Sequence, residues 1–202
     1  MNRRLVVFID YQNTYRSARR AFGFDDSPDH WEGQVHPRTV GELICRRYTD
    51  APTDLKDVRV YRGMPSGTHD RKGYAAAQRQ TSIWTKTTLV SVITRPLRYP
   101  HNYPTDPPEE KGIDVMIALD YVTMAVRGEY DLGVLFSGDT DLVPALEQVI
   151  TLGTVTSEVA AWNPGAGSGA RLRPPGQNIR CHWLDQVDYE AVRDGRDYNI
   201  KS

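Results

Sequence analysis

The chain contains 202 residues, with 25 Lys and Arg against 26 Asp and Glu and a formal net charge of −1. This length suits one domain with a full hydrophobic core, and the balanced charge by itself points to no particular partner. With 39% hydrophobic residues, a mean hydropathy of −0.55 and no apolar run near the roughly 20 residues of a membrane span, we expect a soluble globular protein and no membrane partner.

Cysteine usage and the N-terminal sequence indicate a cytoplasmic protein. Cys45 and Cys181 are the two cysteines; they lie far apart, and neither belongs to a C-x-x-C pattern. We therefore expect reduced thiols, with no disulfide framework and no zinc site. The apolar stretch after Arg4 stops at Asp10, which is too short for the core of a signal peptide and is better explained as a first strand.

The first half of the chain alternates strand and helix patterns. Short apolar or β-branched runs predict strands over Arg4–Ile9, Val58–Tyr61 and Leu89–Arg95. Helical patterns follow over Gln12–Phe22, Pro37–Tyr48 and His69–Thr85. The polar, turn-rich stretch at 23–36 is expected to be a loop.

The second half continues the alternation. Tyr99–Glu110 contains four prolines and is predicted to be a loop that gates the site without belonging to the catalytic set. We expect a helix over Asp114–Arg127, a strand over Leu132–Phe136, a helix capped by Thr140 or Asp141 and closed by Gly153, and a strand over Thr154–Trp162. This pattern predicts an α/β fold with a mostly parallel central sheet covered by helices on both faces.

Several carboxylates are predicted to lie at one edge of this sheet. Asp10 and Asp139 each end an apolar strand, Asp141 follows at once, and Asp114 opens a helix. Ligands of open α/β sheets bind at the carboxyl ends of the strands. Crowded carboxylates repel one another unless a hard cation such as Mg²⁺ or Mn²⁺ neutralises them. We therefore predict an acidic metal site for phosphodiester chemistry with Asp10, Asp114, Asp139 and Asp141 as ligands.

Each of these residues also has a structural interpretation. Asp10 and Asp141 are able to serve as helix N-caps, and Asp114 is favourable at a helix start for the dipole alone. Asn13 lies one turn beyond Asp10 and is either a catalytic, orienting amide or a capping amide. Asp120 lies roughly 240° around the helix from Asp114, so it is a secondary candidate, a buried helper or a salt-bridge partner.

Three stretches resemble the signatures of the NYN domain family, which belongs to the PIN-like ribonucleases. They are Phe8-Ile9-Asp10-Tyr11-Gln12-Asn13, Lys111-Gly112-Ile113-Asp114 with Asp120, and Ser137-Gly138-Asp139-Thr140-Asp141-Leu142. The order and the placement of the three stretches are similar to those of the bacterial LabA-like branch. The resemblance extends from about Arg4 to about Asp185.

The resemblance implies a PIN-like three-layer α/β/α domain over residues 1–185 and a C-terminal extension over 186–202. It further implies metal-dependent hydrolysis of RNA, with Asp10, Asn13, Asp114 and Asp139 as the catalytic set and Mg²⁺ or Mn²⁺ as the cofactor. Ser137 is a further candidate because its hydroxyl is able to bind a ligand carboxylate or the phosphate. Lys111 is another, either neutralising a phosphate or simply solvated.

Basic residues are concentrated in the N-terminal half. Residues 1–100 hold 17 Lys and Arg against 10 Asp and Glu, whereas residues 101–202 hold 8 against 16. A basic surface beside an acidic site suits RNA, although a chance distribution of surface charge is the alternative. The candidate RNA-binding residues are Arg16, Arg19, Arg20, Arg62, Arg71 and Lys72; otherwise they form a solvated charged face.

Three functions compete at this stage. The first is a metal-dependent ribonuclease, and the second is a catalytically silent RNA-binding or regulatory module on the same fold. The third is a haloacid-dehalogenase-like phosphatase, which is less favoured because Gln12 stands where that class needs a second acid. The Gly-rich stretch 165–169 does not follow a strand-to-helix pattern and is not expected to bind phosphate. The sequence leaves a homo-oligomer possible.

Overall fold

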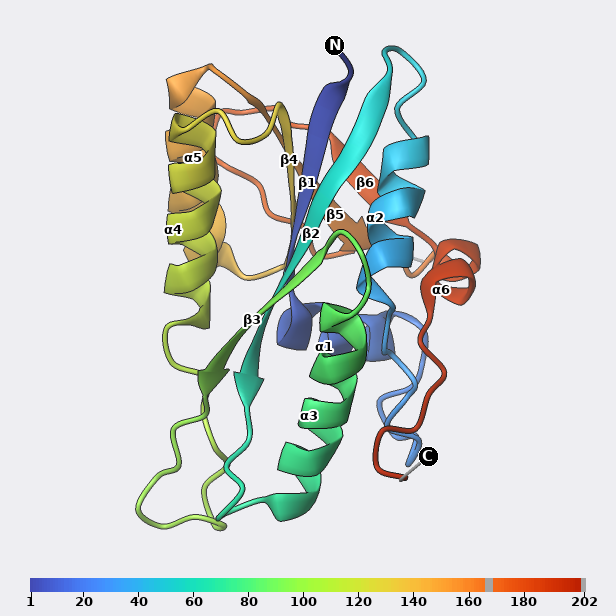
Figure 1. Ribbon diagram of the computed structural model, residues 1–202, viewed down its shortest axis with the longest axis vertical. Helices are drawn as coiled ribbons and strands as arrows, with labels where there is room; N and C mark the ends of the chain where they lie inside the picture. The colour runs from blue at the N-terminus through green and yellow to red at the C-terminus, as the bar shows by residue number, and fades with distance from the viewer. Residues whose placement is uncertain (166–168, 201–202) are drawn as a thin grey trace.

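The described residues are built around a six-stranded, all-parallel sheet (Figure 1). We describe the protein's computed structural model over residues 1–165 and 169–200. The strand order is β3-β2-β1-β4-β5-β6. The strands are β1 (Arg3–Asp10), β2 (Thr53–Met64), β3 (Val90–Pro96), β4 (Leu132–Phe136), β5 (Thr156–Trp162) and β6 (Cys181–Leu184). The predicted α/β fold with a parallel sheet is confirmed.

Helices cover both faces of the sheet and make a three-layer structure (Figure 1). One face carries α4 (Ile113–Val126) and α5 (Val143–Leu152). The other face carries α1 (Tyr11–Ala21), α2 (Pro37–Arg46), α3 (Arg71–Thr85) and α6 (Gln186–Val192). None of the helices in the described ranges is long and apolar enough to span a membrane.

Strand β1 is the centre of the sheet because it is apolar on both sides. Leu5–Ile9 are fully buried. Val7 and Ile9 pack in the core beneath α1 and α2, whereas Val6 and Phe8 pack beneath α4 and α5. Side chains alternate between the two faces of a strand, so a continuous apolar run is what a strand with helices on both faces requires.

The largest differences from the predicted elements are the length of β2 and the cap that follows β4. Strand β2 begins at Thr53 rather than Val58, and its first residues alternate between exposed and half-buried positions. The expected cap at Thr140 or Asp141 is also wrong. Asp139 is the cap: its Oδ1 accepts the Asp141 N–H at 3.1 Å and closes a 3₁₀ turn over Thr140–Leu142 before α5 begins.

Helix α6, which the sequence analysis assigned to the extension after residue 185, packs into the core. Tyr189 and Val192 are buried in the core beneath α2. The Gly33 N–H donates to Tyr189 Oη at 2.7 Å, and the His36 N–H donates to the Val192 carbonyl at 2.8 Å. The C-terminal segment therefore also fastens the 23–36 loop.

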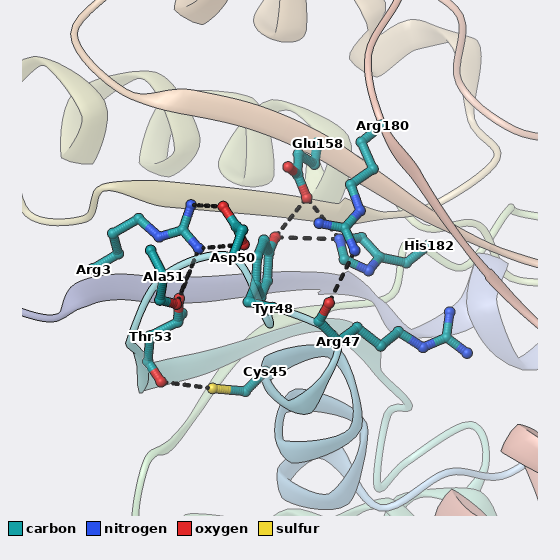
Figure 2. Close-up of polar contacts among 10 residues, drawn as sticks. All are labelled: Arg3, Cys45, Arg47, Tyr48, Asp50, Ala51, Thr53, Glu158, Arg180 and His182. Carbon is teal, nitrogen blue, oxygen red and sulfur yellow. Dashed lines mark hydrogen bonds and ion pairs between the residues drawn. The ribbon is translucent and has the colours of Figure 1, made fainter.

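A buried polar cluster lies near the amino ends of the strands (Figure 2). Tyr48 Oη donates to Glu158 Oε2 at 2.5 Å, and His182 Nε2 lies 2.7 Å from the same oxygen. The guanidinium groups of Arg180 and Arg3 lie 4.9 and 5.2 Å from the Tyr48 ring centre. This cluster joins α2 to β5 and β6, at the end of the sheet away from the candidate site.

Candidate nuclease site

Asp10 is the centre of the candidate site. It is the last residue of β1 and the N-cap of α1, and its side chain accepts the Asn13 N–H at 3.2 Å. Its second carboxylate oxygen accepts a hydrogen bond of 2.9 Å from Ser137 Oγ, which follows β4. The neighbouring strands β1 and β4 thus deliver their terminal polar residues to one point, as their parallel pairing requires.

No Lys, Arg or His of the described residues forms an ion pair with the Asp10 carboxylate. The residue is only 6% exposed. Burial, together with the nearby carboxylates of Glu110 and Asp139, raises the pKa of Asp10 to about 6, against the two hydrogen bonds, which lower it. A buried acid without a cationic partner destabilises the protein when it ionises, unless a cation binds beside it.

The loop after β4 is held in a fixed shape by Asn13 and Ser137. Asn13 Oδ1 accepts the Gly138 N–H at 2.8 Å, and Ser137 Oγ accepts the Asp139 N–H at 3.0 Å. A side chain at Gly138 would place its Cβ 3.4 Å from Asn13 Oδ1. Asn13 and Ser137 therefore position Asp10 and Asp139 relative to each other.

Glu110 joins this group and was not identified from the sequence. It ends the proline-rich loop, and its Oε1 accepts the Gly63 N–H at 2.6 Å. With the Gln12 amide oriented to satisfy both neighbours, Gln12 donates to Glu110 Oε2 at 2.6 Å and accepts from Arg16 Nη2 at 2.8 Å. Burial raises the pKa of Glu110, opposed by the Gly63 bond and by Arg16 and Arg62.

These residues line a cleft of about 330 Å³ at the carboxyl ends of β1, β4 and β5. Asp10, Glu110 and Asp139 supply acid groups to its wall. Arg16 and Arg20, one turn apart on α1, line the same cleft. Phe136 and Trp162 contribute apolar surface. The cleft therefore combines carboxylates for a cation with guanidinium groups for a phosphate.

The sequence profile of the NYN domain matches residues 4–170. This chain belongs to the NYN domain family. NYN domains are part of the PIN-like nuclease superfamily, whose members commonly use divalent metal ions. No protein with a curated description matches the chain.

The NYN fold is also similar to a solved structure. The crystal structure of a protein of unknown function from Vibrio parahaemolyticus matches with a TM-score of 0.50 and 15% sequence identity. The match covers 79% of this chain and 81% of that one. At this identity the likeness concerns the fold alone.

Two of the predicted ligands of the NYN domain lie in a different groove. Asp114 and Asp141 line a shallow depression between α4 and α5, together with Val115, Leu119 and Pro144. Neither of them lines the cleft around Asp10. The structure therefore brings Asp10, Asn13, Ser137 and Asp139 together, adds Glu110, and leaves Asp114 and Asp141 as a separate pair.

The two remaining secondary candidates have other partners. Asp120 Oδ2 accepts from Arg59 Nη2 at 2.8 Å and from Tyr61 Oη at 2.7 Å, so Asp120 is the salt-bridge partner that the sequence analysis gave as one alternative. Lys111 is exposed and its ammonium lies 3.1 Å from a carboxylate oxygen of Glu109.

The six basic candidates fall into four groups. Arg16 and Arg20 line the acidic cleft, while Arg62 and Lys72 line a neighbouring cavity. Arg71 is exposed at the start of α3. Arg19 points to the 23–36 loop, where its guanidinium donates to the carbonyls of Ser27, Asp29 and Glu32. Arg19 is thus occupied by the loop and unavailable to a phosphate.

The donor set in the cleft fits a hydrated cation better than a closed cage. Within residues 1–165 and 169–200, no three Asp, Glu, His or Cys side chains are close enough to ligate one ion together. Mg²⁺ usually keeps several waters and takes one or two carboxylates in addition. Asp10 and Asp139, joined through Ser137, would meet that requirement, and Glu110 lines the same cleft.

Proposed function

We propose that this NYN domain is a ribonuclease that hydrolyses RNA phosphodiester bonds with the help of Mg²⁺ or Mn²⁺. The main support is the buried, uncompensated Asp10 carboxylate, which shares one cleft with Asp139 and Glu110. Buried acids with a raised pKa in a cleft are typical of functional sites. RNA as the substrate, rather than another phosphodiester, rests on the family and on the adjacent arginines.

The residues of the cleft have separate roles in this proposal. Arg16 and Arg20 bind the non-bridging oxygens of the phosphate, and a fixed guanidinium fork suits that geometry. Asn13 and Ser137 hold the two aspartates in place. A bound divalent ion supplies neutralisation of the leaving oxygen and a lower pKa for the attacking water. Asp10 and Asp139 hold that ion, and Glu110 orients water at the edge of the cleft.

A second candidate is an RNA-binding module without catalysis. It is favoured by the open arrangement of the acids, because no three of them in the described residues converge on one point. The phosphatase alternative has less support. Gln12 occupies the position of the second acid and bonds Glu110 and Arg16.

Cleavage assays with labelled RNAs decide between the two candidates. The protein is incubated with single-stranded and hairpin RNAs in Mn²⁺, in Mg²⁺ and in EDTA. The proposal expects cleavage in a metal, none in EDTA, and none with Asp10→Asn. Asp54→Asn, an exposed acid at the other end of β2, is the matched control and keeps the wild-type rate. RNA binding without cleavage in either metal would favour the silent module.

A further inference from the structure

A second cavity, of about 520 Å³, lies directly beside the acidic cleft. Its walls come from α1, α3, the end of β2 and residues 198–199. Gln12 and Glu110 line both hollows, so this pair of side chains lies where they meet. A chain-like ligand in the cleft that extends past Gln12 therefore enters this cavity.

Arg62 is the unusual feature of the cavity. Its guanidinium lies 4.9 Å from the ring centre of Tyr11 and 5.9 Å from that of Trp84. Its Nη1 donates to Gln80 Oε1, whereas its buried Nε has no hydrogen-bond partner. No carboxylate of the described residues forms an ion pair with Arg62. The cation is held between two aromatic rings and forms no ion pair, although Glu110 lies near enough to attract it.

A buried guanidinium without an anion is costly, which suggests that a ligand supplies the anion. The two acids that line the cavity are already engaged in hydrogen bonds. Glu110 accepts from Gly63 and Gln12, and Asp70 caps α3 by accepting the Gly73 N–H at 2.8 Å. Lys72 brings a second cation to the same cavity. The described residues that line the cavity thus include two cations and two acids, and both acids are already hydrogen-bonded within the protein.

We propose that this cavity is a phosphate subsite that binds a phosphate of the RNA chain next to the one being cleaved. The subsite rests on the proposed function and specifies its substrate further. The phosphate accepts from Arg62 Nη2 and from Lys72, and the strand crosses over Gln12 and Glu110. Only an unpaired strand bends into a cavity of this kind, so the substrate is single-stranded at this point.

Binding measurements in an Asp10→Asn background test the subsite without cleavage. The probe is a fluorescein-labelled, eight-nucleotide single-stranded RNA, titrated by anisotropy at several salt concentrations in EDTA. Arg62→Gln is expected to weaken binding about tenfold or more, as for a lost charge-assisted contact. Lys72→Gln is expected to weaken it severalfold, and each change flattens the slope of log affinity against log salt by about 0.7.

Arg59→Gln is the matched control because Arg59 lies on the same strand and faces α4, where it pairs with Asp120. The RNA affinity and the salt slope of Arg59→Gln are expected to equal those of the protein with Asp10→Asn alone. Circular dichroism melts verify the fold of each variant. Lys72 is exposed, so Lys72→Gln keeps the test valid if Arg62→Gln fails to fold.

Two forms of the probe separate the sources of the phosphate. If the cavity takes a 5′-terminal phosphate, the 5′-phosphorylated RNA binds more tightly than the 5′-hydroxyl form, and Arg62→Gln removes that difference. If it takes an internal phosphate, both forms lose affinity equally. Unchanged affinity and slope in folded Arg62→Gln and Lys72→Gln would overturn the subsite. In that case, RNA cleavage by the wild type would still support the nuclease proposal. Conversely, if both variants lose RNA affinity but the wild type cleaves no RNA, the subsite is supported and the nuclease proposal is not.

Discussion

Asp10 is both a helix cap and the buried acid of the cleft, and these two roles shift its pKa in opposite directions. As a cap it accepts the Asn13 N–H, which favours its ionised form. Burial acts in the other direction and prevails, since the pKa rises to about 6. Without a cation, the folded protein therefore holds a proton on Asp10 at a pH where the unfolded chain has lost it.

The raised pKa of Asp10 makes the stability of the metal-free protein depend on pH. Between about pH 4 and pH 6 the folded state binds more protons at Asp10 than the unfolded state, so this residue lowers stability as the pH rises through that window. Asp10→Asn removes that loss and is expected to stabilise the metal-free protein at pH 7 by up to about 3 kcal/mol. Chemical denaturation at pH 5 and pH 7 with EDTA measures the effect. A variant less stable than wild type at pH 7 would contradict it.

Ser137 is the second residue whose role is separable by mutation. Its hydroxyl donates to Asp10 and accepts the Asp139 N–H, so Ser137→Ala loses both bonds at once. We expect a cost of about 1–3 kcal/mol in the free energy of unfolding and a further rise in the pKa of Asp10. The cleavage rate is expected to fall with KM almost unchanged, because positioning rather than RNA binding is lost. Cleavage kinetics at a saturating metal concentration test this, and Ser17→Ala, on the same cleft, is the control for a lost hydroxyl.

At the scale of single elements, α1 divides its arginines between two surfaces. Arg16 and Arg20 are about 40° apart around the helix, whereas Arg19 is about 60° from Arg16 on the other side and about 100° from Arg20. The pair lines the cleft, and Arg19 holds the 23–36 loop. Spacing of three and four residues suggested a single basic face, but only contacts with the loop determine which surface each residue joins.

This division predicts different outcomes for the three arginines. The double variant Arg16→Gln/Arg20→Gln is expected to lower RNA affinity and to flatten the salt slope by about 1.4 for single strands. Arg19→Gln should leave the slope intact and instead lower the melting temperature, because three loop carbonyls lose their donor. Anisotropy titrations and thermal melts on all variants measure both properties. Equal salt slopes in the double variant and the wild type would show that α1 does not contact the RNA backbone.

The proline-rich loop is anchored at its beginning and at its end. Tyr99 stacks on His69 with ring centres 4.4 Å apart, and its hydroxyl accepts the Ser66 N–H at 3.0 Å. Glu110 then fixes the end of the loop to Gly63. Both attachments lie on the segment that follows β2 or on its last residues, so this loop and β2 together border the cleft.

Replacing Tyr99–Asp106 by a short Gly/Ser linker tests the predicted gate. The change keeps Glu110 and removes the anchored part that carries Tyr99. A gate is expected to change the relative rates on different RNAs by several-fold while the metal concentration for half-maximal activity stays the same. Steady-state kinetics on single-stranded and hairpin RNAs give both quantities. Identical kinetics on each RNA would make the loop a passive surface segment.

At the scale of the whole molecule, the features that were predicted correctly are those that follow from strong local sequence patterns. The apolar runs Leu5–Ile9 and Leu132–Phe136 are buried on both faces, so their strand character and the meeting of Asp10 with Asp139 followed from the fold type. Strand β2 was predicted too short because its first half is solvated and lacks an apolar run. Glu110 was missed because its position depends on the path of an irregular loop, which no periodicity reveals.

The separation of Asp114 from the cleft has a similar origin. Its position at the start of α4 was predicted within one residue, but the direction of the helix start was not. Gly112, with a φ of 76°, turns the chain immediately before α4, and such a turn decides which groove the first side chains of the helix reach. The LabA-like branch, the homo-oligomer and the metal ligands stay predictions.

The central place of β1 in the sheet also governs how the chain reaches its native state during synthesis. Leu5 pairs with Leu55 on one side and with Leu132 on the other, and the second partner is made 127 residues after Leu5 itself. Until the ribosome has released β4, one edge of the most apolar strand in the protein has nothing to pair with. Contacts of such long range slow folding and leave hydrophobic edges open to aggregation. Nascent chains that end before residue 132 are therefore expected to bind chaperones, and release from them is expected only once β4 has emerged.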